Sequence, residues 1–179
     1  METRRLGNTD LDLTPIGFGT WAIGGGDWGM GWGPQEEKDS IGSILEGLEA
    51  GINWIDTAHA YGFGLSEEVV GKALREWGQP VIVATKCGVL SNADKTPRRF
   101  ASRELILDEV EGSLRRLQVE TIDLYQLHWP EPDVTVIRKI LTDTTPCFDG
   151  ETSTGLNPGK VLPHLFDQKD LVCLKPFPV

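Results

Sequence analysis

Cysteines, basic residues and long apolar runs are all scarce in this chain of 179 residues. Its three cysteines, Cys87, Cys147 and Cys173, form no C-x-x-C pair, so we expect neither a disulfide framework nor a cysteine zinc site. No apolar run has the length of a signal sequence or a membrane span. The 17 basic residues face 27 acidic ones, a net charge of −10 that disfavours binding to nucleic acid or membrane surfaces. We therefore expect a cytoplasmic protein with a small substrate that is not strongly anionic.

Short apolar strands alternate with amphipathic helices up to about residue 134. The pattern predicts an N-terminal hairpin over residues 4–14, then strands over 16–21, 52–56, 81–85 and 122–127. It predicts helices over 41–48, 66–77 and 102–117, the second capped by Ser66 and the third beginning near Ser102. Such alternation is typical of right-handed crossovers and a parallel sheet. It leaves open whether the sheet is an open, doubly wound one or a barrel.

Eight glycines between residues 17 and 33 predict a loop over residues 22–35. Gly24, Gly26 and Gly29 fit the spacing G-x-G-x-x-G, which in dinucleotide-binding folds opens a helix that holds a pyrophosphate. Here the sequence Met-Gly-Trp-Gly-Pro over residues 30–34 follows, and it does not start a helix. We expect a loop over a site rather than a Rossmann fold.

Ionisable residues stand at the ends of three successive predicted strands. Asp56, Lys86 and His128 take these positions, and Tyr61 follows Asp56 in the adjoining loop. In a barrel the carboxyl ends of neighbouring strands converge on one face, so we expect these four side chains to lie together.

The chemistry of such a group is that of an acid that donates a proton to a developing alkoxide. An ammonium about 4 Å from a phenol favours the phenolate by roughly 4 kcal/mol at an effective dielectric of 20, before desolvation opposes it. An aspartate beside the ammonium would keep it charged, and a histidine could orient a substrate carbonyl. General acid catalysis of this kind typically contributes about 10² to 10⁴ in rate.

Five segments of the chain resemble the aldo-keto reductases. They are GFGTW (17–21), DTAHAYG (56–62), SEEVVG (66–71), ATKCG (84–88) and DLYQLHWP (123–130). The resemblance covers about residues 4–133 and implies an α/β fold of the (β/α)8 TIM-barrel type, with an N-terminal hairpin closing its base. It also implies NADPH-dependent reduction of aldehydes or ketones without a Rossmann domain.

The resemblance assigns a role to each residue of the predicted site. It implies that Tyr61 is the general acid, that Lys86 strengthens it, that Asp56 pairs with Lys86, and that His128 orients the carbonyl. It places NADP(H) near Gly19, Thr20, Trp21 and Asp56, and it places the small carbonyl substrate against Trp21 and Trp129. No metal is implied.

Two other enzyme classes lack their defining residues. A short-chain dehydrogenase needs Tyr-x-x-x-Lys, and neither Tyr61 nor Tyr125 has a lysine four positions later. A metal-dependent barrel hydrolase needs a His-x-His pair, whereas the three histidines are isolated. Cys87 is expected to be a packed thiol rather than a reactive one.

The composition changes near residue 134. Residues 135–179 hold five basic and five acidic residues and are rich in proline, threonine and glycine, without a helix or strand period. We expect a truncated barrel: a first half over residues 1–134, with the hairpin and about four βα units, and an atypical tail. The alternative is a non-catalytic half-barrel that pairs through its open sheet edges with itself or with another protein, or a cofactor-responsive regulatory subunit of the same family.

Overall fold

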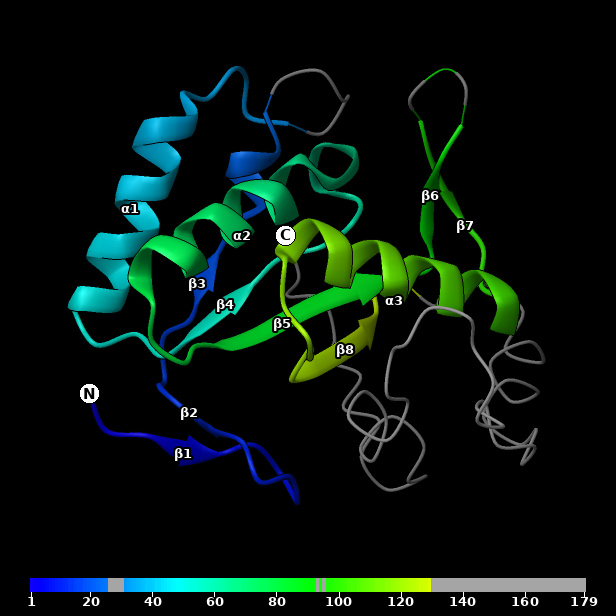
Figure 1. Cartoon of the computed structure of the whole chain (residues 1–179). Coiled ribbons are helices and arrows are strands. Elements are labelled where there is room, and N and C mark those ends of the chain that lie inside the picture. The colour runs from blue at the N-terminus through cyan, green and yellow to red at the C-terminus, as the bar shows by residue number, and fades with distance from the viewer. Residues whose placement is uncertain (26–30, 93, 95, 130–179) are drawn as a thin grey trace.

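A parallel sheet with helices on one side forms the centre of the computed structural model, which describes residues 1–25, 31–92, 94 and 96–129 (Figure 1). The strands follow the order β3 (Phe18–Gly19), β4 (Trp54–Asp56), β5 (Ile82–Cys87) and β8 (Leu124–Leu127). All neighbours are parallel. The helices are α1 (Glu37–Glu49), α2 (Leu65–Trp77) and α3 (Arg103–Leu117). The predicted parallel α/β arrangement is confirmed.

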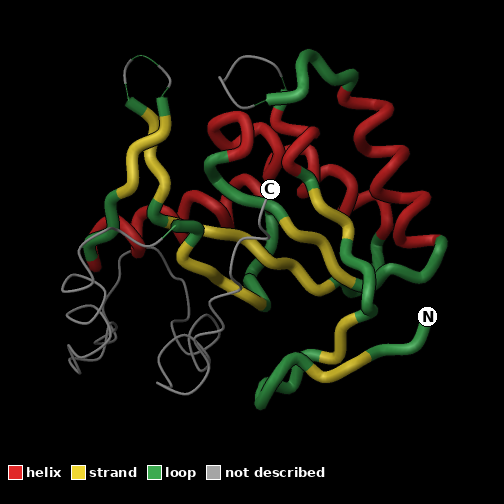
Figure 2. Tube along the Cα trace, turned by 180° about the vertical axis from the view of Figure 1, so that it is seen from behind, coloured by secondary structure: helices red, strands yellow, loops and turns green. Residues whose placement is uncertain are grey.

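Two antiparallel hairpins flank this sheet. The predicted N-terminal hairpin consists of β1 (Arg4–Arg5) and β2 (Asp12–Leu13) and lies apart from the helices, as Figure 2 shows from behind. Asn53, just before β4, fixes it: the side-chain amide donates to the carbonyl of Asp12 and accepts from the amide of Thr14. The second hairpin, β6 (Val89–Ser91) with β7 (Pro97–Arg99), was not predicted.

Several predicted boundaries differ from the observed ones. The first strand is only two residues long, and the 3-10 helix η1 (Trp21–Gly24) begins at the last residue of the predicted strand and continues into the predicted loop. Helix α2 is capped by Gly64, whose positive φ suits glycine, so Ser66 is not the cap and lies within the helix. Ser102 does cap α3, and its hydroxyl accepts from the amide of Leu105 at 3.2 Å.

Some sequence features lie outside the described residues. Gly26 and Gly29 of the glycine motif belong to this group, as do Cys147, Cys173 and the predicted tail over residues 135–179. No helix in the part of the chain that the structure describes is long and apolar enough to cross a membrane.

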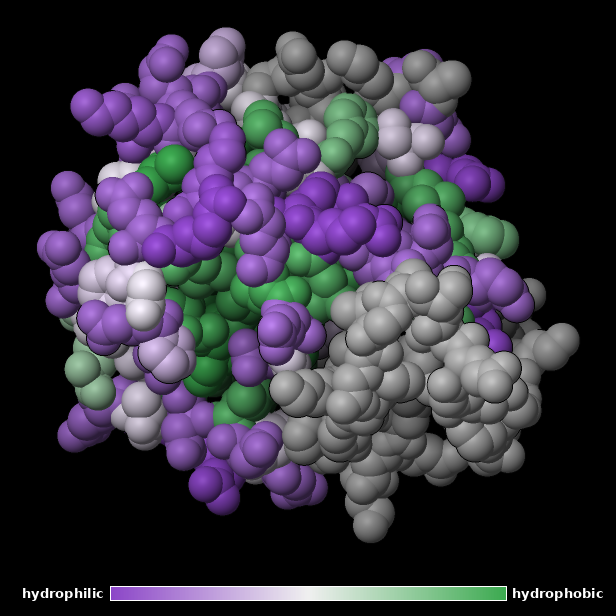
Figure 3. Space-filling view, viewed as in Figure 1, coloured by the Kyte–Doolittle hydropathy of each residue, from purple (hydrophilic) through white to green (hydrophobic). Residues whose placement is uncertain are grey.

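The core fills the space between the sheet and the helices. Its buried apolar side chains come from the predicted stripes of the helices and from the strand faces opposite the site, and they include Ile44, Leu48, Ile55, Val70, Val83, Leu114 and Leu117. Figure 3 shows polar residues over the outer surface of the helices and an apolar area around α2, β4 and β5. Burial of the stripes thus holds each helix on the sheet.

Helices α2 and α3 approach each other closely at Gly71. A Cβ atom at Gly71 would lie 2.6 Å from the backbone oxygen of Leu117, a distance that real side chains do not tolerate. The absence of a side chain at this position therefore allows the two helices to cross.

Substituting Gly71→Ala should destabilise the fold by about 1–3 kcal/mol, because the two backbones must separate. Gly42→Ala, in α1, is the matched control, since a Cβ atom there meets nothing within 4 Å. It should instead stabilise by up to about 1 kcal/mol through helix propensity. Urea unfolding of both variants measures the difference, and equal effects would contradict the proposed close crossing.

Candidate active site

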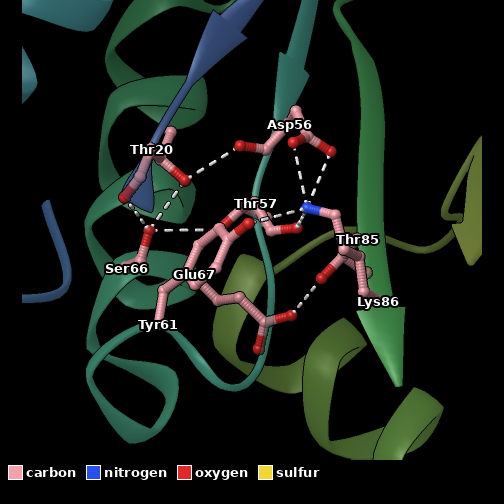
Figure 4. A network of polar contacts seen from close by, with 8 residues as sticks. All are labelled: Thr20, Asp56, Thr57, Tyr61, Ser66, Glu67, Thr85 and Lys86. Carbon is pink, nitrogen blue, oxygen red and sulfur yellow. Dashed lines mark hydrogen bonds and ion pairs between the residues drawn. The ribbon is translucent and has the colours of Figure 1, made fainter. Parts of the chain in front are cut away.

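The Lys86 ammonium group lies at the centre of a cluster of oxygen atoms (Figure 4). Its Nζ is 2.9 Å from both carboxylate oxygens of Asp56 and donates to the Thr57 carbonyl at 2.8 Å. It also donates to the Tyr61 hydroxyl at 3.1 Å. The Lys86 side chain is only 12% exposed, so these acceptors replace the water that burial removes.

Strand register explains why these residues meet. Asp56 pairs with Ala84 across the parallel strands, and Lys86 lies two residues further along β5. Because side chains alternate along a strand, Ala84 and Lys86 share the face to which Asp56 points. Tyr61 begins the 3-10 helix η2 (Tyr61–Gly64), which a short loop joins to the end of β4. The sequence prediction that Asp56, Tyr61 and Lys86 lie together agrees with this geometry.

His128 follows β8 and lies beside the phenol. Its amide donates to the Cys87 carbonyl at 2.9 Å, which continues the strand pairing beyond β8. The imidazole is edge-on to the Tyr61 ring, with centroids 5.5 Å apart, and 5.5 Å from the Trp129 ring. Burial, together with the nearby Lys86 charge, lowers the pKa of His128 to about 4. His128 is therefore neutral at pH 7.

Tyr61 and His128 border a cavity of about 140 Å³, and the predicted substrate residues Trp21 and Trp129 also line it. Its lining consists of Trp21, Ala60, Tyr61, Val89, Pro97, His128 and Trp129. Val89 and Pro97 come from the β6–β7 hairpin, which the sequence did not predict. The walls are mostly apolar, with a hydroxyl and an imidazole among them, an arrangement that suits a small organic ligand with one polar group.

The residues predicted to hold the cofactor divide into two groups. Gly19 and Trp21 are exposed, and the side chain of Asp56 is 33% exposed, so all three are accessible at the carboxyl ends of the strands. Thr20 is fully buried, and its hydroxyl donates to the Asp56 carbonyl and accepts from Ser66. The Thr20 side chain thus supports the site from inside the protein.

Sequence reasoning missed the polar groups that lie behind these residues. The carbonyl of Thr57 binds Lys86, and the Ser66 hydroxyl contacts both Thr20 and Thr57 (Figure 4). The sequence offered one signal for these groups, which is that Ser66 stands beside the apolar stripe of a predicted helix. Cys87 is a buried thiol, and burial raises its pKa to about 12, so it is packed and unreactive as expected.

Comparison with known proteins identifies the family. The sequence model of the Aldo/keto reductase family matches residues 15–156. Aldo-keto reductase YhdN of Bacillus subtilis (strain 168) is 49% identical over 138 residues, which are 76% of this chain and 40% of the relative. The NADH-specific methylglyoxal reductase of Escherichia coli (strain K12) is 42% identical over 135 residues, which are 69% of this chain and 40% of the relative.

A solved structure supports the same assignment. Glycerol dehydrogenase AKR11B4 from Gluconobacter oxydans matches with a TM-score of 0.64 and 44% identity, over 73% of this chain and 40% of that chain. The chain belongs to the aldo-keto reductase family, whose fold is a (β/α)8 barrel, and the resemblance predicted from the motifs is confirmed. It spans about 40% of the length of these relatives.

The protonation state of His128 can be tested by NMR. Its imidazole resonances should titrate with a midpoint of about 4, and His128→Asn identifies them by their loss. Since the unfolded chain takes up this proton near pH 6.5, His128 should also reduce stability as the pH falls from about 6.5 to about 4. A midpoint near 6.5 in the folded protein would contradict the assignment.

Proposed function

We propose that this chain carries the proton-donating half of an NADP(H)-dependent reductase that converts aldehydes or ketones to alcohols. The observation that carries the proposal is the 3.1 Å contact between the Lys86 ammonium and the Tyr61 hydroxyl, with Asp56 bound to the same ammonium. When bound, the reduced nicotinamide supplies a hydride to the carbonyl carbon. The chain's own residues bind the carbonyl and deliver the proton to its oxygen.

Each residue has a distinct task in this scheme. Tyr61 borders the cavity and donates its phenolic proton to the oxygen on which negative charge develops. The Lys86 ammonium stabilises the phenolate that remains. Neutral His128 can donate a ring N–H to the carbonyl oxygen and so orients it beside Tyr61. The Asp56 carboxylate pairs with the ammonium and holds it in place.

The described residues fit a nicotinamide ring near the ends of β3 and β8. Gly19 is exposed, and a Cβ atom there would meet nothing within 4 Å, so a flat ring can approach the backbone. On β8, the register pairs Gln126 with Lys86, and the Gln126 Oε1 is buried without a hydrogen-bond partner among the described residues. This oxygen can accept from a carboxamide. The choice of NADP(H) rests on the motif resemblance, and one relative is named NADH-specific, so both cofactors enter the test.

The cavity favours small carbonyl substrates. Its volume of about 140 Å³ and its tryptophan walls leave room for a few heavy atoms beside Tyr61 and His128. Two relatives are named for methylglyoxal and glycerol, each a three-carbon compound. We infer that short aldehydes and α-oxo aldehydes are the substrates to try first.

The purified chain should oxidise NADPH or NADH when methylglyoxal is added, measured by the loss of nicotinamide absorbance. Tyr61→Phe should lower kcat by about 10² or more, because it removes the proton donor. Tyr125→Phe is the matched control, since Tyr125 packs against the core and lies away from the cavity, and it should keep most of the activity. Turnover that stays at the buffer level with both cofactors would contradict the proposal for this chain.

We propose as a second candidate a non-catalytic role through self-association. Among the described strands, β3 pairs only with β4 and β8 only with β5, so each has one edge without a partner strand. The backbone groups of such an edge can pair with another chain.

Sedimentation velocity over a range of concentrations tests self-association. A second copy that covers these edges should give a dimer. The monomer fraction should become large only at the lowest concentrations. A single monomeric species throughout, with cooperative melting, would contradict this candidate and would leave the reductase proposal standing.

A further inference from the structure

A fully buried carboxylate lies on the side of the sheet opposite the cavity. Glu67, in the first turn of α2, has no exposed surface. Its Oε1 accepts from the Thr85 hydroxyl at 2.6 Å, and its Oε2 accepts from Arg116 Nε at 2.7 Å (Figure 4 shows the first contact). Burying a carboxylate is costly unless each oxygen is paired, so Thr85 and Arg116 are held firmly against Glu67.

Arg116, in the last turn of α3, extends this contact to the loop that carries Tyr61. Its guanidinium donates to His59 Nδ1 at 3.1 Å. Burial and the Arg116 charge lower the pKa of His59, so the ring is neutral and can accept this hydrogen bond. Arg116 also packs under Gly64, where a Cβ atom would lie only 2.6 Å from the arginine Cδ. Arg116 thus contacts the loop over residues 59–64 at both of its ends.

The residues that Glu67 and Arg116 contact are close in sequence to Lys86 and Tyr61. Thr85 immediately precedes Lys86, and His59 is two residues before Tyr61. The Glu67–Arg116 pair therefore links the strand that carries Lys86 to the loop that carries Tyr61, and these two residues make the 3.1 Å contact. Neither charged residue of the pair lines the cavity.

We propose that the buried Glu67–Arg116 ion pair is a positioning device that sets the distance between Lys86 and Tyr61, and with it the acid strength of the phenol. The proposal rests on the proposed function, in which Tyr61 is the proton donor. A purely structural pair would hold α2 against α3 without affecting Tyr61. Ionisation of the phenol distinguishes the two roles.

The test uses ultraviolet absorbance titration of phenolate in the full chain without cofactor. The sequence has only two tyrosines, and burial raises the pKa of Tyr125 well above its usual range. Tyr61→Phe assigns the signal. The variants are Arg116→Lys, which keeps the charge but loses the planar fork, and Glu67→Gln. The controls are their sequence neighbours Arg115→Lys and Glu68→Gln, which are exposed.

Both variants should move the Tyr61 ionisation to higher pH by roughly one unit, a tenfold weaker acid. The sign for Glu67→Gln is decisive. Removing a negative charge by itself favours the phenolate and would move the titration to lower pH, whereas loss of positioning moves it to higher pH. The two control variants should titrate like the wild type. Circular dichroism and urea unfolding establish that each variant is folded.

Unchanged Tyr61 titration in the folded variants, or a shift to lower pH in Glu67→Gln, would overturn the inference. If Arg116→Lys or Glu67→Gln does not fold, Thr85→Val is the substitute. It removes only the hydroxyl that links Glu67 to β5, and the same upward shift is expected. The titration needs neither cofactor nor turnover. A wild-type chain without reductase activity would therefore overturn the proposed function while the titration still decides this inference.

Discussion

The buried charge of Lys86 is the constraint on which the rest of the site depends. An ammonium group that loses its water must find acceptors within the protein, and here they come from the end of β4, the backbone after it and the η2 helix. All three contacts require β4 and β5 to keep their parallel register and the following loop to turn back over the strand ends. The same contacts bring the phenol of Tyr61 to the ammonium. The contacts that stabilise the buried charge are thus the same contacts that would activate Tyr61 as the proposed acid.

Polar contacts attach helix α2 to the carboxyl ends of the strands. Apolar packing at this place would leave no polar groups to support the site. The Ser66 hydroxyl contacts Thr20 and Thr57, and the Glu67 carboxylate contacts Thr85. Further along, α2 is held by apolar side chains such as Val70. The helix therefore changes from hydrophobic packing to directional hydrogen bonds as it approaches the site. Hydrogen bonds fix distances and angles more narrowly than apolar contact does, and the site requires that precision.

Strand pattern and chain direction were sufficient to predict which side chains meet. Parallel strands bring their carboxyl ends to one edge, so the places of Asp56, Lys86 and His128 followed from where three apolar runs stop. The contact between Glu67 and Arg116 joins residues 49 positions apart, and no local pattern encodes such a pair. The Thr57 acceptor is a backbone carbonyl, which any residue would supply. Ser66 was mistaken for a cap because serine suits both a helix start and a buried hydrogen bond, and only the sheet beside it decides between them.

The charge of Lys86 also bears on which neighbour acts as the acid in the proposed reaction. The ammonium contacts the Tyr61 hydroxyl, whereas on His128 burial of the ring and, second, the Lys86 charge lower the pKa to about 4. At pH 7 the imidazole of His128 is therefore neutral. A neutral imidazole can orient a carbonyl by hydrogen bonding, but it is too weak an acid to protonate the oxygen as the imidazolium would. Burial and one positive charge thus separate the two roles in the proposed reaction, in which Tyr61 donates the proton and His128 orients the carbonyl.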